Sequence, residues 1–169
     1  TAWHDPNTRF DSEIGWVPIA SSRIQKDWGT ISTNAAAFRS PEARRDATSV
    51  AILGDSVTWG YGVDGNVPFA SKLDAQLRAR GAQAFNLGVS GYGIGQSVLW
   101  FERSADSLPR LSDVVLTLCA QNDVADTQRN ARYGRRKPLF RLQADAPESL
   151  ATEVTPIRRR SLRHAYTDS

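Results

Sequence analysis

The chain has 169 residues with a formal net charge of +3, and 40% of its residues are hydrophobic. This length suits one domain with a buried core, and the composition excludes a disordered chain. No apolar run reaches the roughly 18 residues that a membrane-spanning helix needs, so we expect no such helix. The single cysteine, Cys119, excludes an internal disulfide and lies in an apolar run, which predicts a buried thiol.

The N-terminal segment, residues 1–46, is rich in Trp, Asn, Ser and Pro and shows little periodicity. This composition predicts a cover of loops and short strands. We expect Trp16, Trp28 and Phe38 to pack the cover on the rest of the protein.

The middle segment, residues 47–128, alternates strand and helix patterns. Short apolar runs at 49–53, 82–87 and 113–118 predict three strands. A strand that stays apolar throughout is typical of burial on both faces, as in a parallel sheet.

Two helices are predicted between these strands. The first runs from Pro68 to Gly81, and the second passes through 98–101 to about Leu108, where Pro109 ends it. In the first helix, the helical period places one set of side chains on the buried face and another toward solvent. We expect the buried set to be Phe69, Leu73 and Leu77, and the outward set to be Ser71, Asp74 and Arg78.

The C-terminal segment, residues 129–169, holds ten of the 21 Lys and Arg but four of the 18 Asp and Glu, which leaves 11 bases and 14 acids in residues 1–128. Its prolines break any long helix, so we expect a basic, irregular segment. Such a segment can bind nucleic acid or an anionic surface. Because its arginines are not interleaved with aromatic residues on a recognisable module, we expect no nucleic-acid partner and instead a solvated or protein-packed segment.

The order of strands and helices predicts an α/β fold, with three α/β/α layers around a parallel sheet. Ligands of such sheets bind at the carboxyl ends of the strands. The three strands end in Gly54-Asp55-Ser56, in 86–91 and in 120–123, so we expect these loops to meet and to form the site.

The three loops carry the groups that an acyl-transfer site needs. A serine hydroxyl is a poor nucleophile unless a base takes its proton and fixed donors receive the developing oxyanion. Ser56 directly follows a strand, so its hydroxyl lies at the sheet edge and its backbone N–H is a candidate donor. Gly91 lets a second N–H approach a ligand because it has no Cβ, and Asn122 supplies a side-chain amide.

Each of these residues alone has an ordinary alternative role. A serine after a strand can cap a helix, and Asn122 can hold a turn. The glycines of 88–95 can form a phosphate-binding loop, although Gln96 stands where the third glycine of that motif belongs. Three such residues at successive strand ends are far more specific than any one of them.

In this order the three blocks resemble the SGNH (GDSL-type) hydrolase superfamily, whose first block is Gly-Asp-Ser. Ser56 matches the family nucleophile, Gly91 the glycine of the second block and Asn122 the asparagine of the third. The resemblance implies the flavodoxin-like SGNH hydrolase fold and an oxyanion hole built from the N–H groups of Ser56 and Gly91 and the amide of Asn122. It also implies that no metal or organic cofactor is used, and it favours a bacterial protein in the periplasm or outside the cell.

The chain departs from the family pattern in three places. Val57 and Ala120 replace the leucine and glycine that members usually carry. The last family block, an Asp-x-x-His that supplies the base, is not found, because a serine stands three residues before His164. We expect His164 to be a surface residue, and His4 has the wrong place and spacing. The base and its carboxylate are therefore expected beyond Ser169 in a longer protein.

The flanking segments agree with that expectation. Residues 10–18, 31–34 and Phe38-Arg39 resemble the leader of larger bacterial SGNH proteins, and 137–140 resembles the segment after their third block. The chain also contains no methionine. We therefore expect the fold to be incomplete at its C-terminus, with the resemblance strongest for residues 50–123.

The predicted function is hydrolysis of a short-chain acyl ester, such as an acetyl ester, of a small molecule or carbohydrate through an acyl-enzyme on Ser56. Without its base, the chain alone is expected to show weak or no turnover. Two alternatives stay open: an O-acyltransferase acting on a carbohydrate, and a catalytically incomplete SGNH-like binding module. Asp55, Trp59, Tyr61 and Tyr92 flank the site and are candidates for substrate contact, with core packing as the alternative for the aromatic residues. The oligomeric state stays open.

Overall fold

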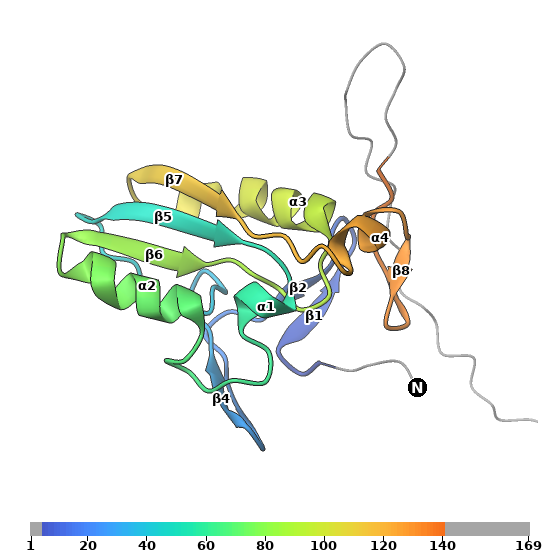
Figure 1. Ribbon diagram of the computed structural model, residues 1–169, viewed down its shortest axis with the longest axis horizontal. Helices are drawn as coiled ribbons and strands as arrows, with labels where there is room; N and C mark the ends of the chain where they lie inside the picture. The colour runs from blue at the N-terminus through green and yellow to red at the C-terminus, as the bar shows by residue number, and fades with distance from the viewer. Residues whose placement is uncertain (1–4, 141–169) are drawn as a thin grey trace, which may run out of the picture.

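The computed structural model describes residues 5–140 and begins with two antiparallel hairpins (Figure 1). β1 (Thr8–Asp11) pairs with β2 (Gly15–Pro18), and β3 (Arg23–Lys26) pairs with β4 (Gly29–Ser32). The first turn forms because the Asp11 carboxylate accepts hydrogen bonds from the next two free N–H groups, those of residues 13 and 14, at 3.1 and 2.9 Å. Short strands and loops thus make up this segment.

A three-stranded parallel sheet forms the centre of the protein. β5 (Thr48–Leu53) lies between β6 (Ala82–Asn86) and β7 (Leu111–Leu116), and both neighbours run parallel to it. Each crossover between parallel strands carries a helix, as parallel connections require. The expected parallel sheet and α/β fold class are confirmed.

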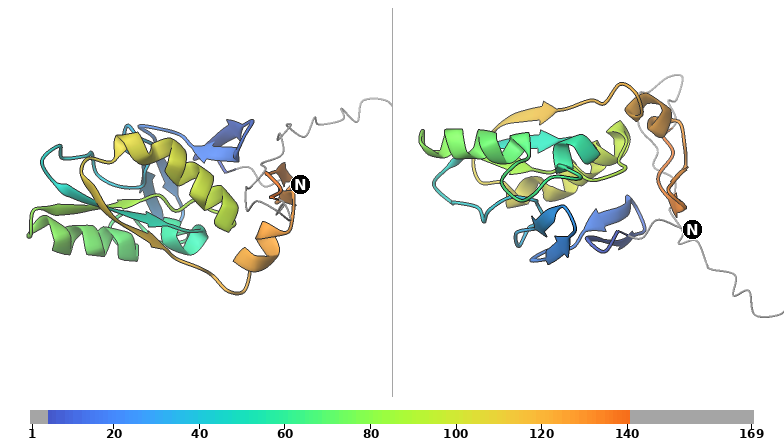
Figure 2. Two further views of the ribbon diagram at one scale, coloured as in Figure 1. Left: turned by 90° about the horizontal axis from the view of Figure 1, so that it is seen from above. Right: turned by 60° about the horizontal axis from the view of Figure 1, so that its bottom comes forward.

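Helices cover both faces of this sheet, on opposite sides in the left view of Figure 2. α2 (Phe69–Arg78) packs on one face, and α3 (Ile94–Ser104) packs on the other and continues into the 3₁₀ helix η1 (Ala105–Ser107). Successive side chains of β5 point to opposite faces of the sheet, so neighbouring residues of this strand contact different helices. On the α2 face, Ile52 and Ala84 pack with Ala70, Leu73 and Leu77; on the α3 face, Ala51, Leu53 and Phe85 pack with Trp100.

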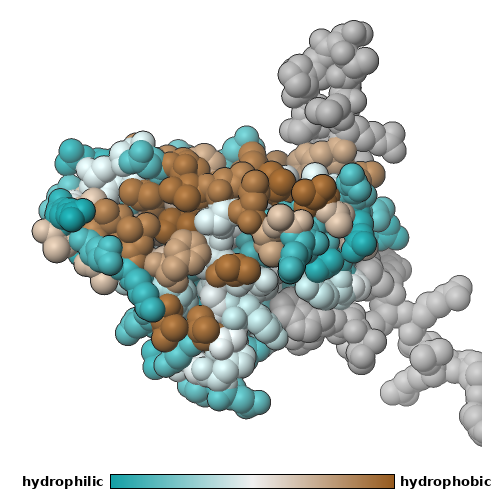
Figure 3. All heavy atoms as spheres, viewed as in Figure 1, coloured by the Kyte–Doolittle hydropathy of each residue, from teal (hydrophilic) through white to brown (hydrophobic). Residues whose placement is uncertain are grey.

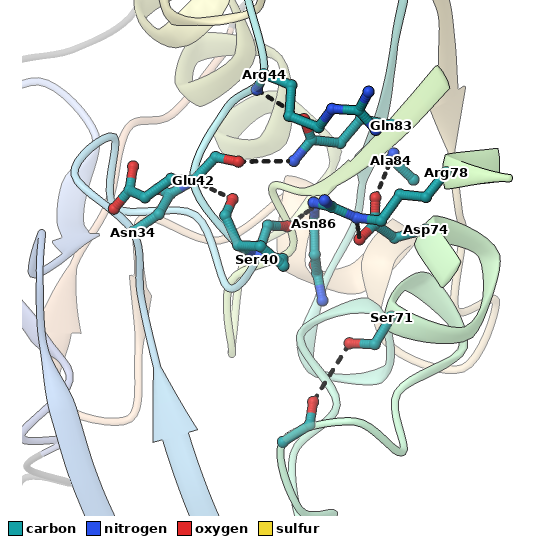
Figure 4. Close-up of polar contacts among 12 residues, drawn as sticks. Asn34, Ser40, Glu42, Arg44, Ser71, Asp74, Arg78, Gln83, Ala84 and Asn86 are labelled. Atoms are coloured by element: carbon teal, nitrogen blue, oxygen red, sulfur yellow. Dashed lines mark hydrogen bonds and ion pairs between the residues drawn. The ribbon is translucent and has the colours of Figure 1, made fainter. Parts of the chain in front are cut away.

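The buried face of α2 differs from the predicted one at two positions. Leu73 and Leu77 pack on the sheet as expected, but Phe69 is exposed and Asp74 is buried. The Asp74 carboxylate accepts hydrogen bonds from the backbone N–H of Ala84 at 3.0 Å and from the Arg78 side chain at 2.6 Å (Figure 4). A buried carboxylate is tolerated because both oxygens have donors, a compensation that the helical period alone does not reveal.

The N-terminal hairpins pack on the same side of the sheet as α3 (Figure 2). Trp16 and Phe38 belong to the main core, whereas Trp28, which was expected to pack in the same way, is only half-buried and lies outside it. The following segment is tied to β6 by side chains: Gln83 donates to the Glu42 carbonyl at 3.0 Å, and the Ser40 hydroxyl accepts from an N–H of β6 at 2.8 Å (Figure 4).

β7 begins and ends two residues earlier than the predicted strand, and every one of its residues is exposed. Val114, Val115 and Leu116 are apolar nevertheless, and Figure 3 shows apolar side chains gathered over this part of the sheet. Among the described residues, β7 is an edge strand, so its apolar run does not mean burial there.

Cys119 follows this strand and is half-buried, so the prediction of a buried thiol is wrong.

The described chain ends with α4 (Asp123–Thr127) and a small hairpin of β8 (Ala131–Arg132) and β9 (Arg135–Arg136). Basic side chains of this hairpin contact the protein itself: Arg132 pairs with Asp126 at 2.8 Å, and Arg135 donates to the Thr8 hydroxyl at 2.7 Å. No helix within residues 5–140 has the length and apolar character needed to cross a bilayer.

Candidate active site

Ser56 lies where the central strand β5 gives way to the single-turn helix α1 (Ser56–Trp59). The cap of this helix is Asp55, whose carboxylate accepts a hydrogen bond from the N–H of Val57 at 2.9 Å. Because Asp55 takes the capping role, the half-buried hydroxyl of Ser56 is not used for it.

The second loop lies directly on α1. A Cβ on Gly88 would come within 2.5 Å of the Trp59 backbone nitrogen, so only glycine allows this close approach. The N–H of Val89 donates to the Gly54 carbonyl at 3.0 Å, and the side chain of Asn86 donates to the Thr58 carbonyl at 2.8 Å. Hydrogen bonds therefore join the loop that carries Gly91 to the loop that carries Ser56.

The third loop reaches the first through Asn122. Its side-chain amide donates to a carboxylate oxygen of Asp55 and to one of Asp123, each at 3.2 Å. The Thr117 hydroxyl donates to the Leu53 carbonyl at 2.9 Å, which holds the start of this loop against the end of β5. The amide of Asn122 thus contacts Asp55, the residue directly before the predicted nucleophile.

The second and third loops also touch each other. A Cβ on Gly93 would lie 3.2 Å from the backbone of Asp126 in α4, so α4 packs against the N-terminus of α3. A buried carboxylate residue therefore stands where a phosphate-binding loop would hold its anion, which disfavours the phosphate-loop alternative. Gly91 itself has φ of +81°, a left-handed backbone that favours glycine. All three predicted loops meet at the carboxyl edge of the sheet.

Several charged groups are buried around this junction. Burial raises the pKa of the Asp123 carboxyl, and the negative charges of Asp55 and Asp126 add to that effect, although the Cys119 N–H donates to it at 2.7 Å. Burial lowers the pKa of the Lys137 ammonium to about 8, even though Asp126 opposes that shift. Acidic and basic side chains therefore balance one another behind Asn122 rather than facing solvent.

The three aromatic candidates for substrate contact occupy different environments. Tyr92 is fully buried and its hydroxyl donates to the Trp16 carbonyl at 2.5 Å, which places it in the core. Trp59 is also buried, whereas Tyr61 is exposed and stacks at a tilt on Trp28 with the ring centroids 5.9 Å apart. A small pocket opens beside these rings, lined by Asp5, Asn7, Lys26, Trp28, Ile31, Trp59 and Tyr61.

Two further residues contact this site, and the sequence predicted no such contact for either of them. Arg39 is buried and donates to the carbonyls of Trp59 and Gly60 at 2.8 and 2.7 Å, so it caps the C-terminal end of α1. Tyr133 lies in the β8–β9 turn with its ring against Gly91. Neither contact follows from sequence spacing, because the partners are distant in the chain.

No histidine that could serve as the base lies among the described residues, since the two histidines of the sequence are His4 and His164. The expectation that His164 is a surface residue lies outside the described range. Within residues 5–140, no group of three or more His, Cys, Asp or Glu side chains is arranged to hold a metal ion.

Comparisons with known proteins found one matching family model and several similar solved structures. The model of the GDSL-like Lipase/Acylhydrolase family matches residues 52–166, which is more than half of the chain. No protein with a curated description matches it. Among solved structures, the SGNH-hydrolase family esterase AlinE4 is 26% identical, with a TM-score of 0.35 over 43% of this chain and 42% of that one. A mutant of the same esterase is 27% identical, with a TM-score of 0.37 over 44% of this chain and 41% of that one. The chain therefore spans less than half the length of these esterases.

Proposed function

The chain belongs to the GDSL-like lipase/acylhydrolase family, and from that membership we propose that it is a serine esterase that forms an acyl-enzyme on Ser56. The observation that carries the proposal is the contact between the first and third loops. The Asn122 amide donates to Asp55 at 3.2 Å, and this contact between distant parts of the sequence supports a site shared by Ser56 and Asn122.

The proposed reaction begins with attack of the Ser56 hydroxyl on the ester carbonyl, as a base accepts the hydroxyl proton. The oxyanion that forms accepts hydrogen bonds from the N–H groups of Ser56 and Gly91 and from the Asn122 amide. For this, one hydrogen of the amide turns away from the Asp55 carboxylate toward the substrate. Collapse of the intermediate expels the alcohol, and water then releases the short acyl group as an acid.

The hydrogen bonds that hold the proposed donors in place support this assignment. Ser56 and Gly91 are held by hydrogen bonds between the backbones of their loops, and Asn122 is flanked by two buried carboxylates. Backbone N–H donors fixed in this way need little reorganisation when charge develops, whereas the Asn122 amide exchanges one of its two hydrogen bonds for the oxyanion. The base is expected to be a histidine paired with a carboxylate, as in the family.

A second function is transfer of the same acyl group to a carbohydrate hydroxyl. The pocket bounded by Trp28, Trp59 and Tyr61 supports a carbohydrate as acceptor, as it would support one as ester substrate, because aromatic faces beside polar side chains suit a sugar. The two functions share the acyl-enzyme and differ in the acceptor. Measuring acid release from p-nitrophenyl acetate with and without added methyl glucoside separates them: an acyltransferase forms acetylated sugar in place of free acetate.

The test of the proposed function is hydrolysis of p-nitrophenyl acetate by the full-length protein and by Ser56→Ala. We expect the variant to lose the activity while keeping its circular dichroism spectrum, and Ser107→Ala, an exposed serine, to behave as the wild type. A fluorophosphonate probe should label Ser56. Unchanged hydrolysis in Ser56→Ala, or labelling of another serine, would overturn the assignment and would favour a binding module.

A further inference from the structure

Tyr133 occupies a backbone conformation that bulky residues avoid. It forms the turn between β8 and β9 together with Gly134, and φ is +49° at Tyr133 and +74° at Gly134. Two left-handed residues in succession are typical of a tight hairpin turn, but Asn, Asp or Gly normally takes the first position. A tyrosine held there against its backbone preference suggests that its side chain has a role.

The ring of Tyr133 lies against the glycine proposed as an oxyanion donor. A Cβ on Gly91 would stand 3.0 Å from Cε2 and 3.2 Å from Cδ2 of Tyr133, and 3.4 Å from Cζ2 of Trp16. Tyr133 is nevertheless 47% exposed, so the residue is not enclosed by the core beside Gly91. An acyl group whose carbonyl oxygen accepts from the Gly91 N–H would therefore extend next to this ring.

Arg132 fixes the position of the ring. Its guanidinium lies over the ring at 4.6 Å from the centroid and donates to the Tyr133 hydroxyl at 3.3 Å. The same guanidinium donates to the Asp126 carboxylate at 2.8 Å, and Asp126 is fully buried in α4, which starts directly after Asn122. The ring is thus tied to two of the three loops that carry the proposed oxyanion donors.

We propose that Tyr133 is a specificity-determining residue that forms a wall of the acyl pocket and limits the length of the acyl chain. This inference rests on the proposed esterase function, because it needs Gly91 to mark the position of the substrate carbonyl. A rigid aromatic ring at that point leaves room for a short acyl group and excludes a long one. The hairpin thereby sets the preference for short-chain esters.

The experiment compares kcat/KM for p-nitrophenyl acetate, butyrate and octanoate in the full-length protein and in Tyr133→Ala. We expect the octanoate-to-acetate ratio to rise at least about tenfold in the variant, since a few methylene groups in a pocket change rates by about that factor or more. Tyr133→Phe should keep the wild-type ratio, because the ring remains. Phe10→Ala removes an aromatic ring of similar exposure from β1 and should leave the ratio unchanged.

The results distinguish a failure of the acyl-wall role of Tyr133 from a failure of the proposed esterase function. If Ser56-dependent hydrolysis is intact but the ratio in Tyr133→Ala equals that of the wild type, the acyl-wall role is wrong and the esterase function stands. A fall of all three rates by one common factor, with a lower melting temperature, would show a purely structural role and would also overturn it. If the wild type has no Ser56-dependent hydrolysis of any of the three esters, the proposed function fails and the inference fails with it.

Discussion

The side-chain amide of Asn122 donates a hydrogen bond to the carboxylate of Asp55 across 3.2 Å, joining two residues that are 67 positions apart in the sequence. Asp55 also accepts from the N–H of Val57, so one carboxylate both caps the helix that carries Ser56 and orients the amide. This double use explains how the polar side chain of Asp55 is buried, because both carboxylate oxygens accept hydrogen bonds.

Asn122→Ala should reduce kcat for p-nitrophenyl acetate by about 10²- to 10³-fold, since it removes one oxyanion donor. KM should change little, because the donor acts mainly on the transition state. Steady-state kinetics of the full-length protein measure both constants. Asn130→Ala, at an exposed position beyond α4, is the matched control and should behave as the wild type. A rise in KM with unchanged kcat would contradict an oxyanion role.

Gly91→Ala and Gly81→Ala form a matched pair for the second loop. Both glycines have left-handed backbones, with φ of +81° and +76°, so each substitution should cost about 1 kcal/mol of unfolding free energy. A Cβ at Gly81 meets open space, whereas one at Gly91 meets the Tyr133 ring. Only Gly91→Ala should therefore lose esterase activity as well as stability. Urea denaturation and initial rates test this, and equal activities in the two variants would contradict it.

Asp74→Ala should destabilise the fold by about 1–3 kcal/mol, because it leaves the buried N–H of Ala84 without its acceptor. Asp74→Asn keeps an acceptor oxygen and should recover part of that loss. The measurement is the midpoint of urea unfolding, with Asp106→Ala as the control at an exposed carboxylate. If Asp74→Ala and Asp106→Ala unfold at the same midpoint, the buried hydrogen bond contributes nothing.

Lys137 should make stability rise with pH. Burial lowers the pKa of its ammonium from 10.5 to about 8, so between these values the unfolded chain keeps a proton that the folded protein has released. Stability rises with pH wherever the unfolded state binds more protons. The free energy of unfolding of the wild type, relative to Lys137→Met, should therefore increase by about 2 kcal/mol from pH 7 to pH 9.5.

The side chains around Lys137 make the comparison with Lys137→Met necessary, because Asp123, Asp126, Arg129 and Arg132 also contribute to its electrostatic environment. The methionine variant keeps the bulk of the side chain and lacks the titrating group. Denaturant unfolding at several pH values gives the difference directly. A difference that stays constant with pH would mean that the folded-state pKa of Lys137 is not lowered.

The sequence predicted the parallel sheet because its three apolar runs are too short for helices and each is separated from the next by a helical pattern. It also predicted that Ser56, Gly91 and Asn122 would share a site, since parallel strands end at one edge. It did not predict that Asp74 is buried, because the N–H that compensates it belongs to β6, and pairing between elements leaves no periodic signal. Nor did it predict the exposure of β7, whose apolar residues resemble those of a covered strand.

What the sequence determined by itself was the order of the elements and the loop proposed to carry the nucleophile, because both depend on neighbouring residues and on where each strand ends. Only the tertiary structure decided which side chains surround that loop. Asp55 meets Asn122, Arg39 caps α1 and Tyr133 covers Gly91, all through contacts between segments far apart in the chain. Such contacts depend on how helices and hairpins pack on the sheet, and local patterns of polarity do not encode that packing.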